Sequence, residues 1–221
     1  MEINKTTTVG EMAAGEPKSI KVFKEVGIDF CCDGKVCLTD ALQKKNITQA
    51  QFTEKLEALK KEPDEAGTPD FLKMTPEALT EHIVNTHHAY LWKILPETYA
   101  LFTKVIRVHG KNHPELFDAF KLFGTVKTDL EQHLTKEEEI VFPEIADIRK
   151  PEGRKLVEQL KVEHEDVGGL MDQIREVNHD YALPPDACMS YTNLYQTMRE
   201  IEEDIHQHIH LENNILFKGI I

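Results

Sequence analysis

The sequence has no long apolar run and no cluster of basic residues, and each absence argues against a class of protein. Among its 221 residues no stretch approaches the roughly 18 apolar residues of a membrane-spanning helix, and residues 1–15 lack the apolar segment of a secretory signal. Its 26 Lys and Arg against 39 Asp and Glu give a formal charge of −13, which repels nucleic acids and anionic lipids. We therefore expect a cytoplasmic protein that binds neither nucleic acids nor membranes.

Cysteines are few, and their positions argue against a disulfide framework. The chain has four, Cys31, Cys32, Cys37 and Cys188, and the first three lie within seven residues, whereas small secreted proteins spread their cysteines along the chain. Clustered thiols in a cytosolic chain indicate metal or redox chemistry, or simply small buried residues that shape a turn. Because Cys31 and Cys32 lie between predicted short helices, we expect a helix N-terminus to lower the pKa of a thiol there.

Strand patterns are almost absent, so the predicted fold class is all-α. The segment 62–70 is acidic and broken by Pro and Gly, which is typical of a linker. We predict a small helical N-terminal domain over residues 1–62, a linker over residues 63–74 and a helical bundle over residues 75–221. The N-terminal domain should hold about four short helices, the clearest from Thr48 to Lys61, where Thr48 and Gln51 form a capping-box pattern.

Four long helical patterns follow the linker. They run over residues 75–108, 114–148, 151–178 and 185–217, and a proline stands near the start of each, where it fits the first helical turn. Pro96 and Pro143 fall inside two of these patterns and should kink or end them. Long helices of similar length with short connections predict an up-down-up-down four-helix bundle.

Each long pattern carries a stripe of residues at the alternating 3-4 spacing of a bundle core, and each stripe contains histidine or glutamate. Unpaired ionisable residues in a core would cost several kcal/mol, so something must satisfy them. In chain order, the predicted core residues are Val84, His88, Leu91, Leu95; Phe123, Val126, Leu130, His133, Glu137, Ile140; Val157, Leu160, His164, Val167, Met171, Ile174; and Leu194, Met198, Ile201, Ile205, His208, Glu212, Ile215.

One motif occurs twice in these stripes. His133-x3-Glu137 recurs as His208-x3-Glu212 at an offset of 75 residues, and an apolar pair and a phenylalanine follow each copy. The lone core histidines, His88 and His164, are 76 residues apart, so the bundle is interpreted as an internal duplication. Residues i and i+4 lie on one face of a helix, and antiparallel neighbours in this register bring all six residues to a common level.

Imidazoles combined with carboxylates suit iron, manganese or zinc, and these stripes contain no thiolate. A closed structural zinc site uses four ligands and would not need six. Two carboxylates from opposite helices could bridge two metal ions, with two histidines for each ion and positions left open for O2, NO or an oxo bridge. A single core histidine is more often a hydrogen-bonded structural residue, but six positions in register favour a metal site. His206 and His210 form a competing i, i+4 pair, which lies off the stripe and is expected at the surface.

Further motifs extend this pattern over essentially the full chain. They are Asp29-Phe30-Cys31-Cys32-Asp33-Gly34-Lys35 with Leu38, then Arg107-Val108-His109, Glu163-His164-Glu165, and Asn213-Asn214 after the second His-x3-Glu. Together with the doubled motif, they resemble the hemerythrin-like bundles, and in particular the RIC (repair of iron centres) family of YtfE/ScdA type. Cys37 lies outside the signature of that family.

The resemblance implies two non-haem iron ions joined by oxo and carboxylate bridges. It implies that His88, His133, His164 and His208 are iron ligands and that Glu137 and Glu212 bridge the two ions. It also implies a redox or iron-transfer role for Cys31 and Cys32 and an access route near Glu163 and Asp129, although a solvated acidic face explains Asp129 nearly as well. Oxygen carriers differ, because they have a further histidine at the position of Gly168 and their last carboxylate follows its histidine by five positions rather than four.

The function expected from this resemblance is repair of iron–sulfur clusters damaged by nitrosative or oxidative stress, with iron passed from a labile centre to damaged client proteins. One alternative is an enzyme that reduces NO to N2O at the two irons. Another is a module that carries or senses O2 or NO, against which Gly168 argues. The sequence leaves open the clients, whether NO reduction is physiological, the role of Cys37, a homodimeric state and the docking of the N-terminal domain.

Overall fold

The computed structural model describes residues 3–4, 6–63 and 69–220, and the chain divides into two compact units. One unit combines Met1–Leu79 with Gln207–Ile221, and the other is Thr80–His206. Within the described residues the only strand-like pairing is an isolated bridge between Thr8 and Cys37, so the predicted all-α class is confirmed. Of the predicted linker, residues 64–68 lie outside the described residues.

The N-terminal region is a small helical cluster with its own core. Its helices are α1 (Val9–Gly15), α2 (Ser19–Val26), α3 (Leu38–Lys44) and α4 (Gln49–Lys60), followed by the 3-10 turn η1 (Phe71–Lys73). Thr48 and Gln51 form the predicted capping box at the start of α4, since each side chain accepts a hydrogen bond from the backbone N–H of the other. The rings of Phe23 and Phe52 stack with centroids 5.4 Å apart in the core of this cluster.

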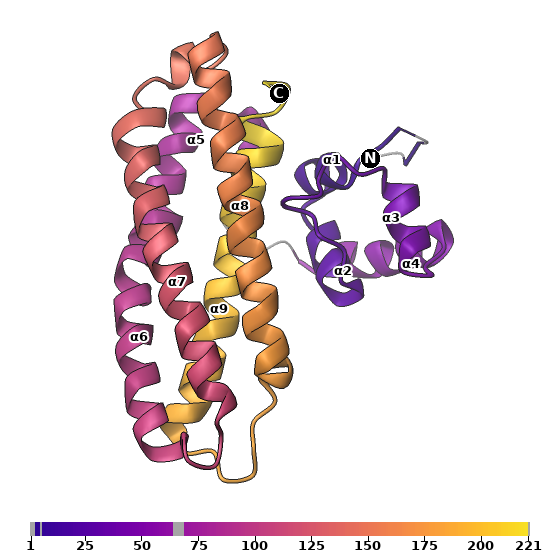
Figure 1. The fold of residues 1–221 in the computed structure, drawn as a ribbon. Helices are drawn as coiled ribbons and strands as arrows, with labels where there is room; N and C mark the ends of the chain where they lie inside the picture. The colour runs from indigo at the N-terminus through magenta and orange to yellow at the C-terminus, as the bar shows by residue number, and fades with distance from the viewer. Residues whose placement is uncertain (1–2, 5, 64–68, 221) are drawn as a thin grey trace. The chain divides into compact units, whose positions relative to one another are not determined.

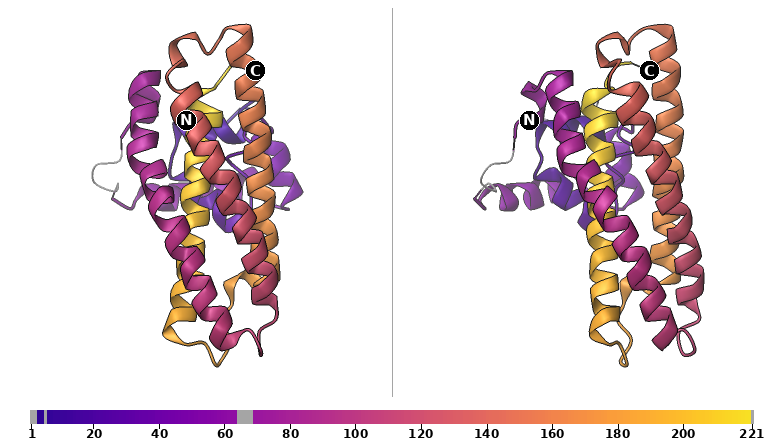
Figure 2. Two further views of the ribbon diagram at one scale, coloured as in Figure 1. Left: turned by 60° about the vertical axis from the view of Figure 1, so that its left-hand side comes forward. Right: turned by 90° about the vertical axis from the view of Figure 1, so that its left-hand side faces the viewer.

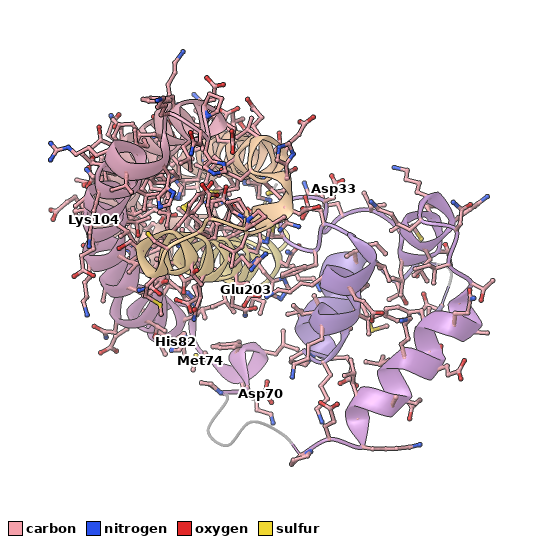
Figure 3. All side chains as sticks on the ribbon, turned by 90° about the horizontal axis from the view of Figure 1, so that it is seen from below. Asp33, Asp70, Met74, His82, Lys104 and Glu203 are labelled. Atoms are coloured by element: carbon pink, nitrogen blue, oxygen red, sulfur yellow. The ribbon has the colours of Figure 1, made fainter. Side chains whose placement is uncertain are left out.

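The long helices form the predicted bundle. α5 (Pro76–Ile83) leads into α6 (Ala89–His109), and α7 (Glu115–Lys136), α8 (Pro151–Val177) and α9 (Met189–Leu211) follow. In the second unit α6, α7, α8 and the part of α9 up to His206 lie alongside one another in alternating directions (Figures 1 and 2). Seen along the helices, charged side chains such as Lys104 extend outward from the bundle (Figure 3). Short 3-10 turns, η4 (Ile145–Asp147) and η5 (His179–Tyr181), stand in the connections on either side of α8.

The helices differ from the sequence expectation at several positions, and the second long pattern, predicted to reach residue 148, ends at Val141. Pro96 lies inside α6, which continues to His109, so this proline does not end the helix. The fourth long helix starts at Met189 rather than near Pro185, which leaves Cys188 exposed just before it. Among the described residues, no helix combines the length and the apolarity needed to span a membrane.

Three π-helical turns interrupt the long helices, and each contains a predicted metal ligand. They are η2 (Val84–His88), η3 (Glu137–Val141) and η6 (Glu212–Leu216). In each turn an N–H donates to the carbonyl five residues earlier; the Phe142-to-Glu137 and Phe217-to-Glu212 hydrogen bonds are both 2.8 Å. Turns of this kind are rare and are frequently found at functional sites.

The π turns explain where the predicted core stripes are wrong. Ile140 is 51% exposed, whereas the next residue, Val141, is fully buried. Likewise Leu216 is buried and Ile215 only partly so, and Ile83 is buried in place of Val84. The extra residue in a π turn shifts by one position whatever lies beyond it, so a stripe counted at α-helical spacing fails there. The stripe predicted for α8, which has no π turn, is buried at every position.

Candidate metal centre

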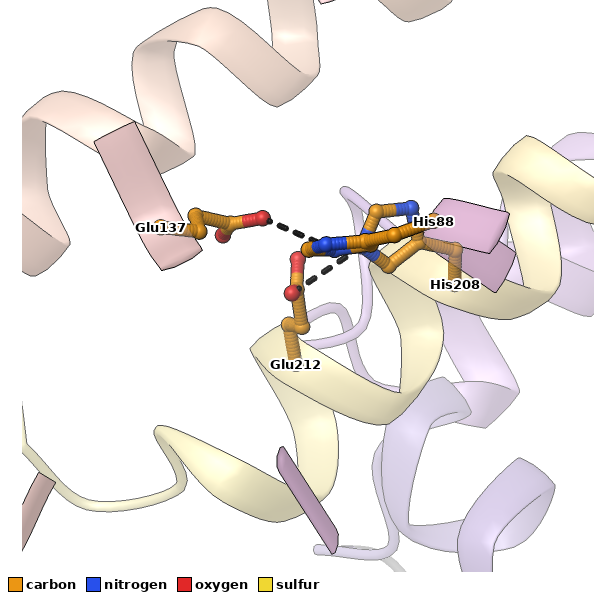
Figure 4. Close-up of side chains that lie close together, drawn as sticks. All are labelled: His88, Glu137, His208 and Glu212. Atoms are coloured by element: carbon orange, nitrogen blue, oxygen red, sulfur yellow. Dashed lines mark hydrogen bonds and ion pairs between the residues drawn. The ribbon is translucent and has the colours of Figure 1, made fainter. Parts of the chain in front are cut away.

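The six predicted ligands are buried, and most of them lie at the ends of regular helix. His88 is the last residue of η2, Glu137 is the first of η3, and Glu212 is the first of η6. His133 and His208 stand one turn before the two glutamates, in α7 and α9, and His164 lies in the middle of the unbroken α8. Figure 4 shows His88, Glu137, His208 and Glu212 close together.

These side chains make two groups that could each hold a metal ion. The first is His88, Glu137, His208 and Glu212, and the second is His133, Glu137, His164 and Glu212. In each group the ligand atoms lie within 4.8 Å of one another. Both groups contain the same two glutamates, whereas each group has its own pair of histidines. This is the arrangement that two metal ions bridged by carboxylates require.

The distances around Glu137 suit shared ligands. Its Oε2 lies 3.4 Å from His88 Nε2 and 3.3 Å from His133 Nε2. The Nε2 atoms of His133 and His164 are 3.1 Å apart, and His208 Nε2 is 3.0 Å from Glu212 Oε1. Ligands with metal bonds of about 2.0–2.2 Å stand roughly 3 Å apart around one ion. Within each group, these contacts of the Nε2 atoms are therefore of the length expected between ligands of one ion.

The chemistry of the donor set fits cations. Glu137 and Glu212 are both 0% exposed, and burying two carboxylates at one level of a core is costly unless positive charge neutralises them. The four histidines are at most 3% exposed and supply nitrogen donors of the kind that iron, zinc and manganese accept. The residues present therefore fit a metal centre built from nitrogen and oxygen ligands.

Two further glutamates orient the histidine rings. Glu138 accepts a hydrogen bond of 2.9 Å from His88 Nδ1 and one of 3.0 Å from Trp92 Nε1. Glu163 accepts a hydrogen bond of 2.9 Å from His133 Nδ1 and also binds Lys136. A carboxylate that accepts a hydrogen bond from Nδ1–H fixes the ring so that Nε2 is the atom that faces a metal. Glu138 could not be predicted from the sequence, because its partner His88 lies 50 residues away on another element.

The two predicted access residues differ in their surroundings. The hydrogen bond from His133, with help from Lys136, lowers the pKa of Glu163 to about 2 although partial burial opposes the shift. The Glu163 carboxylate is therefore charged and touches a candidate ligand directly. Asp129 is exposed on α7, and a role for it in an access route stays a prediction.

The vicinal cysteines lie in a loop organised by Asp29. One oxygen of Asp29 accepts hydrogen bonds from the backbone N–H groups of Cys31 and Cys32, at 2.8 and 2.9 Å, and from the Cys31 thiol at 3.2 Å. The two sulfur atoms are 3.7 Å apart. The hydrogen bond with Cys32 and burial raise the pKa of Cys31, so the expected lowering of a thiol pKa is wrong for this residue. Cys37 stands at the start of α3, with its thiol directed at the Thr7 carbonyl.

Residues that follow Glu212 hold this cysteine loop, all within the first unit. The Asn214 amide donates to the carbonyls of Phe30 and Cys31 at 3.0 and 3.1 Å, and Asn213 donates to Cys31 at 3.3 Å. A Cβ atom on Gly34 would stand only 2.0 Å from the Asn214 side-chain oxygen, so any larger residue there would displace the Asn214 side chain.

His210 also belongs to this contact. It is 2% exposed, its ring packs edge-on to that of Phe30, and burial lowers its pKa to about 4. The expectation that His210 lies at the surface is therefore wrong. Bundle periodicity could not show this, because His210 is covered by the N-terminal segment rather than by the bundle core.

Two family profiles together match most of the chain. The hemerythrin HHE cation binding domain family matches residues 79–220, and the ScdA_N family, described as a domain of unknown function (DUF542), matches residues 5–60. The chain therefore belongs to the hemerythrin HHE cation-binding family, in the branch that carries an ScdA-type N-terminal domain. The predicted family membership and the hemerythrin-like fold are confirmed.

Relatives align along the whole length of the chain. The iron-sulfur cluster repair protein ScdA of Staphylococcus epidermidis is 32% identical over 99% of both chains. A probable iron-sulfur cluster repair protein of Haemophilus influenzae is 32% identical over 96% of both chains. The iron-sulfur cluster repair protein YtfE of Pectobacterium carotovorum is 31% identical over 95% of this chain and 94% of its own.

Proposed function

We propose that the buried centre holds two iron ions. One would be bound by His88 and His208, the other by His133 and His164, and Glu137 and Glu212 would bridge them. The observation that supports this most directly is that both candidate groups contain the same two glutamates. Bound iron would supply redox and ligand-exchange chemistry, and the protein residues supply a buried, carboxylate-oriented donor set.

The proposed activity is repair of iron–sulfur clusters damaged by nitrosative or oxidative stress, with iron as the cargo and damaged cluster proteins as clients in the cytoplasm. The names of the relatives support repair, and none of the three names NO reduction. Six protein ligands for two ions leave coordination positions open, which favours iron that can be released. NO and O2 are the small molecules expected to react there, and a homodimer is one form in which the protein could act.

Metal content tests the centre. Anaerobically loaded protein should contain two irons per chain and absorb in the visible range after oxidation. Glu137→Ala and His208→Ala should each lose at least one iron, whereas His179→Ala, at an exposed position, should keep both. Zinc in place of iron, or two irons retained in both ligand variants, would contradict the assignment.

Reactivation of a damaged dehydratase tests repair. The iron-loaded protein should restore activity to a dehydratase whose [4Fe–4S] cluster was destroyed by NO, and a Cys31→Ser/Cys32→Ser variant should do so more slowly. Cys188→Ser is the matched thiol control and should behave like the parent. Failure of the loaded protein to reactivate the client would rule out repair. Sustained N2O production with a reductant would then favour NO reduction.

A further inference from the structure

A second cluster of histidines lies at the other end of α6, within the second unit. His109 is the last residue of α6, and His113 stands just before α7. Asp186 and Cys188 lie in the connection that precedes α9. Periodicity along one helix could not bring these four residues together, because the two histidines and the other two side chains come from segments more than 70 residues apart.

The donor atoms of this cluster stand close together. Ligand atoms of His109, His113 and Asp186 all lie within 4.8 Å of one another. His113 Nε2 is 2.8 Å from Asp186 Oδ1, and His109 Nε2 is 3.2 Å from Cys188 Sγ. The His113 N–H donates to the His109 carbonyl at 2.9 Å, so one turn of helical backbone places both rings on the same side.

Neighbouring side chains hold the two rings in place. His113 Nδ1 forms a 3.1 Å hydrogen bond with Glu115 Oε1, which leaves Nε2 directed at Asp186. This carboxylate–imidazole pair is the usual support of a metal-binding histidine. The ring of Tyr191, which is fully buried, packs against His109 and His113 with centroids 5.2 and 5.6 Å away.

We propose that His109, His113, Asp186 and Cys188 bind one divalent ion of the zinc class, at a site separate from the buried centre. Two imidazoles, a carboxylate and a thiolate are the ligand types that tetrahedral zinc takes in proteins. The buried centre differs, because its two groups contain no sulfur. The proposal does not depend on the proposed repair function.

Binding requires side-chain movements. Around tetrahedral zinc, ligand atoms stand about 3.3–3.6 Å apart, given bonds of roughly 2.0–2.3 Å. The two closest pairs are now at 2.8 and 3.2 Å, and the ligand atoms of His109, His113 and Asp186 lie within 4.8 Å of one another. Asp186 and Cys188 are both exposed and can move, whereas His109 and His113 are largely buried and form the fixed half of the site.

An ion at this site would cross-link two connections that are far apart in the sequence. The α6–α7 turn supplies both histidines, and the segment before α9 supplies Asp186 and Cys188. The free energy of metal binding would then add to the stability of this end of the bundle. The ion would also cover the sulfur of an otherwise exposed cysteine.

Cobalt(II) is the probe, because tetrahedral Co(II) bound to a thiolate gives an intense near-ultraviolet band. The test uses the iron-loaded full chain with Cys31→Ser, Cys32→Ser and Cys37→Ser, in which Cys188 is the only remaining thiol. One equivalent of Co(II) should produce the band, and Zn(II) should abolish it by displacement. Glu115→Gln should weaken binding about 10- to 100-fold. His179→Gln, which changes a histidine outside the cluster, should bind Co(II) as the parent does.

A second measurement uses the unaltered iron-loaded protein, in case the triple variant fails to fold. One equivalent of Zn(II) should protect Cys188 from alkylation, as followed by mass spectrometry, and His113→Gln should remove the protection. The proposal is overturned if Zn(II) leaves the alkylation rate of Cys188 unchanged, or if the cobalt band persists after Cys188→Ser is added.

Discussion

α7 and α8 both carry a histidine of the candidate centre, but they continue in different ways beyond it. α8 remains α-helical from Pro151 to Val177, and every residue of its predicted stripe is buried. α7 passes into a π turn at Glu137, one turn after His133, and the core residue beyond it is Val141 instead of Ile140. His164 is the candidate ligand on α8, whereas α7 and η3 carry two candidate ligands, His133 and Glu137. The comparison shows that a regular helix can position a candidate histidine, whereas Glu137 stands where regular helix gives way to a π turn.

The largest expected effect comes from deleting Asp166, an exposed residue of α8 that follows His164. The deletion rotates Val167, Met171 and Ile174 away from the core, and removing one large apolar side chain typically costs about 2–5 kcal/mol. The sum approaches the whole stability of a typical domain, about 5–15 kcal/mol. We expect loss of the cooperative thermal transition by circular dichroism.

Deleting Glu139, an exposed residue of the π turn, should be milder. Without it, Val141 becomes the third residue after Glu137, which is a core position in a regular α-helix. The protein should therefore still melt cooperatively, while its iron content falls because Glu137 and Glu138 change their direction. If this deletion unfolds the protein as the Asp166 deletion does, the π turn serves packing rather than the site.

Glutamine variants test whether the two carboxylates that hold histidine rings, Glu163 and Glu138, contribute equally to metal binding. Glu163→Gln and Glu138→Gln remove the negative charge that orients His133 and His88, respectively. Each should weaken metal binding about 10- to 100-fold, measured by competition with a chelator, with little change in the melting of the metal-free protein. Asp129→Asn is the matched control and should leave the affinity unchanged.

The smallest expected effects come from alanine substitutions of Val141 and Ile140, the buried and the exposed neighbour in the π turn. Val141→Ala should destabilise the protein by about 1–2 kcal/mol, because the side chain is fully buried. Ile140→Ala should change stability by less than about 0.5 kcal/mol, because the residue is half exposed. Urea unfolding measures both. Equal losses would mean that Ile140 packs in the core after all.

Much of the architecture could be predicted from the sequence alone. The bundle, the helical N-terminal region and the α8 stripe follow from apolar periodicity, which responds to burial along a regular helix. The repeat offset of 75–76 residues groups the six buried residues without any knowledge of the structure. Both inferences assume regular helix, and they hold where that assumption holds.

The π turns could not be predicted, and the reason is local. Each core residue that was predicted wrongly has a buried apolar neighbour. Val84 lies beside Ile83, Ile140 beside Val141, and Ile215 beside Leu216. A stripe counted at 3.6 residues per turn therefore accepts either member of the pair. Contacts between distant segments could not be predicted either, which is why Glu138 was missed and His210 was expected at the surface.

The side chain of Asn214 links the π turn of Glu212 to the cysteine loop. It stands in the same π turn as Glu212, two residues further on, and binds the carbonyls of Phe30 and Cys31 at its other end. The Asn214 side chain lies so close to the loop backbone at Gly34 that a Cβ atom there would overlap with it. A rotation of the π turn that moves the Glu212 carboxylate would therefore also displace the loop backbone that carries Cys31 and Cys32.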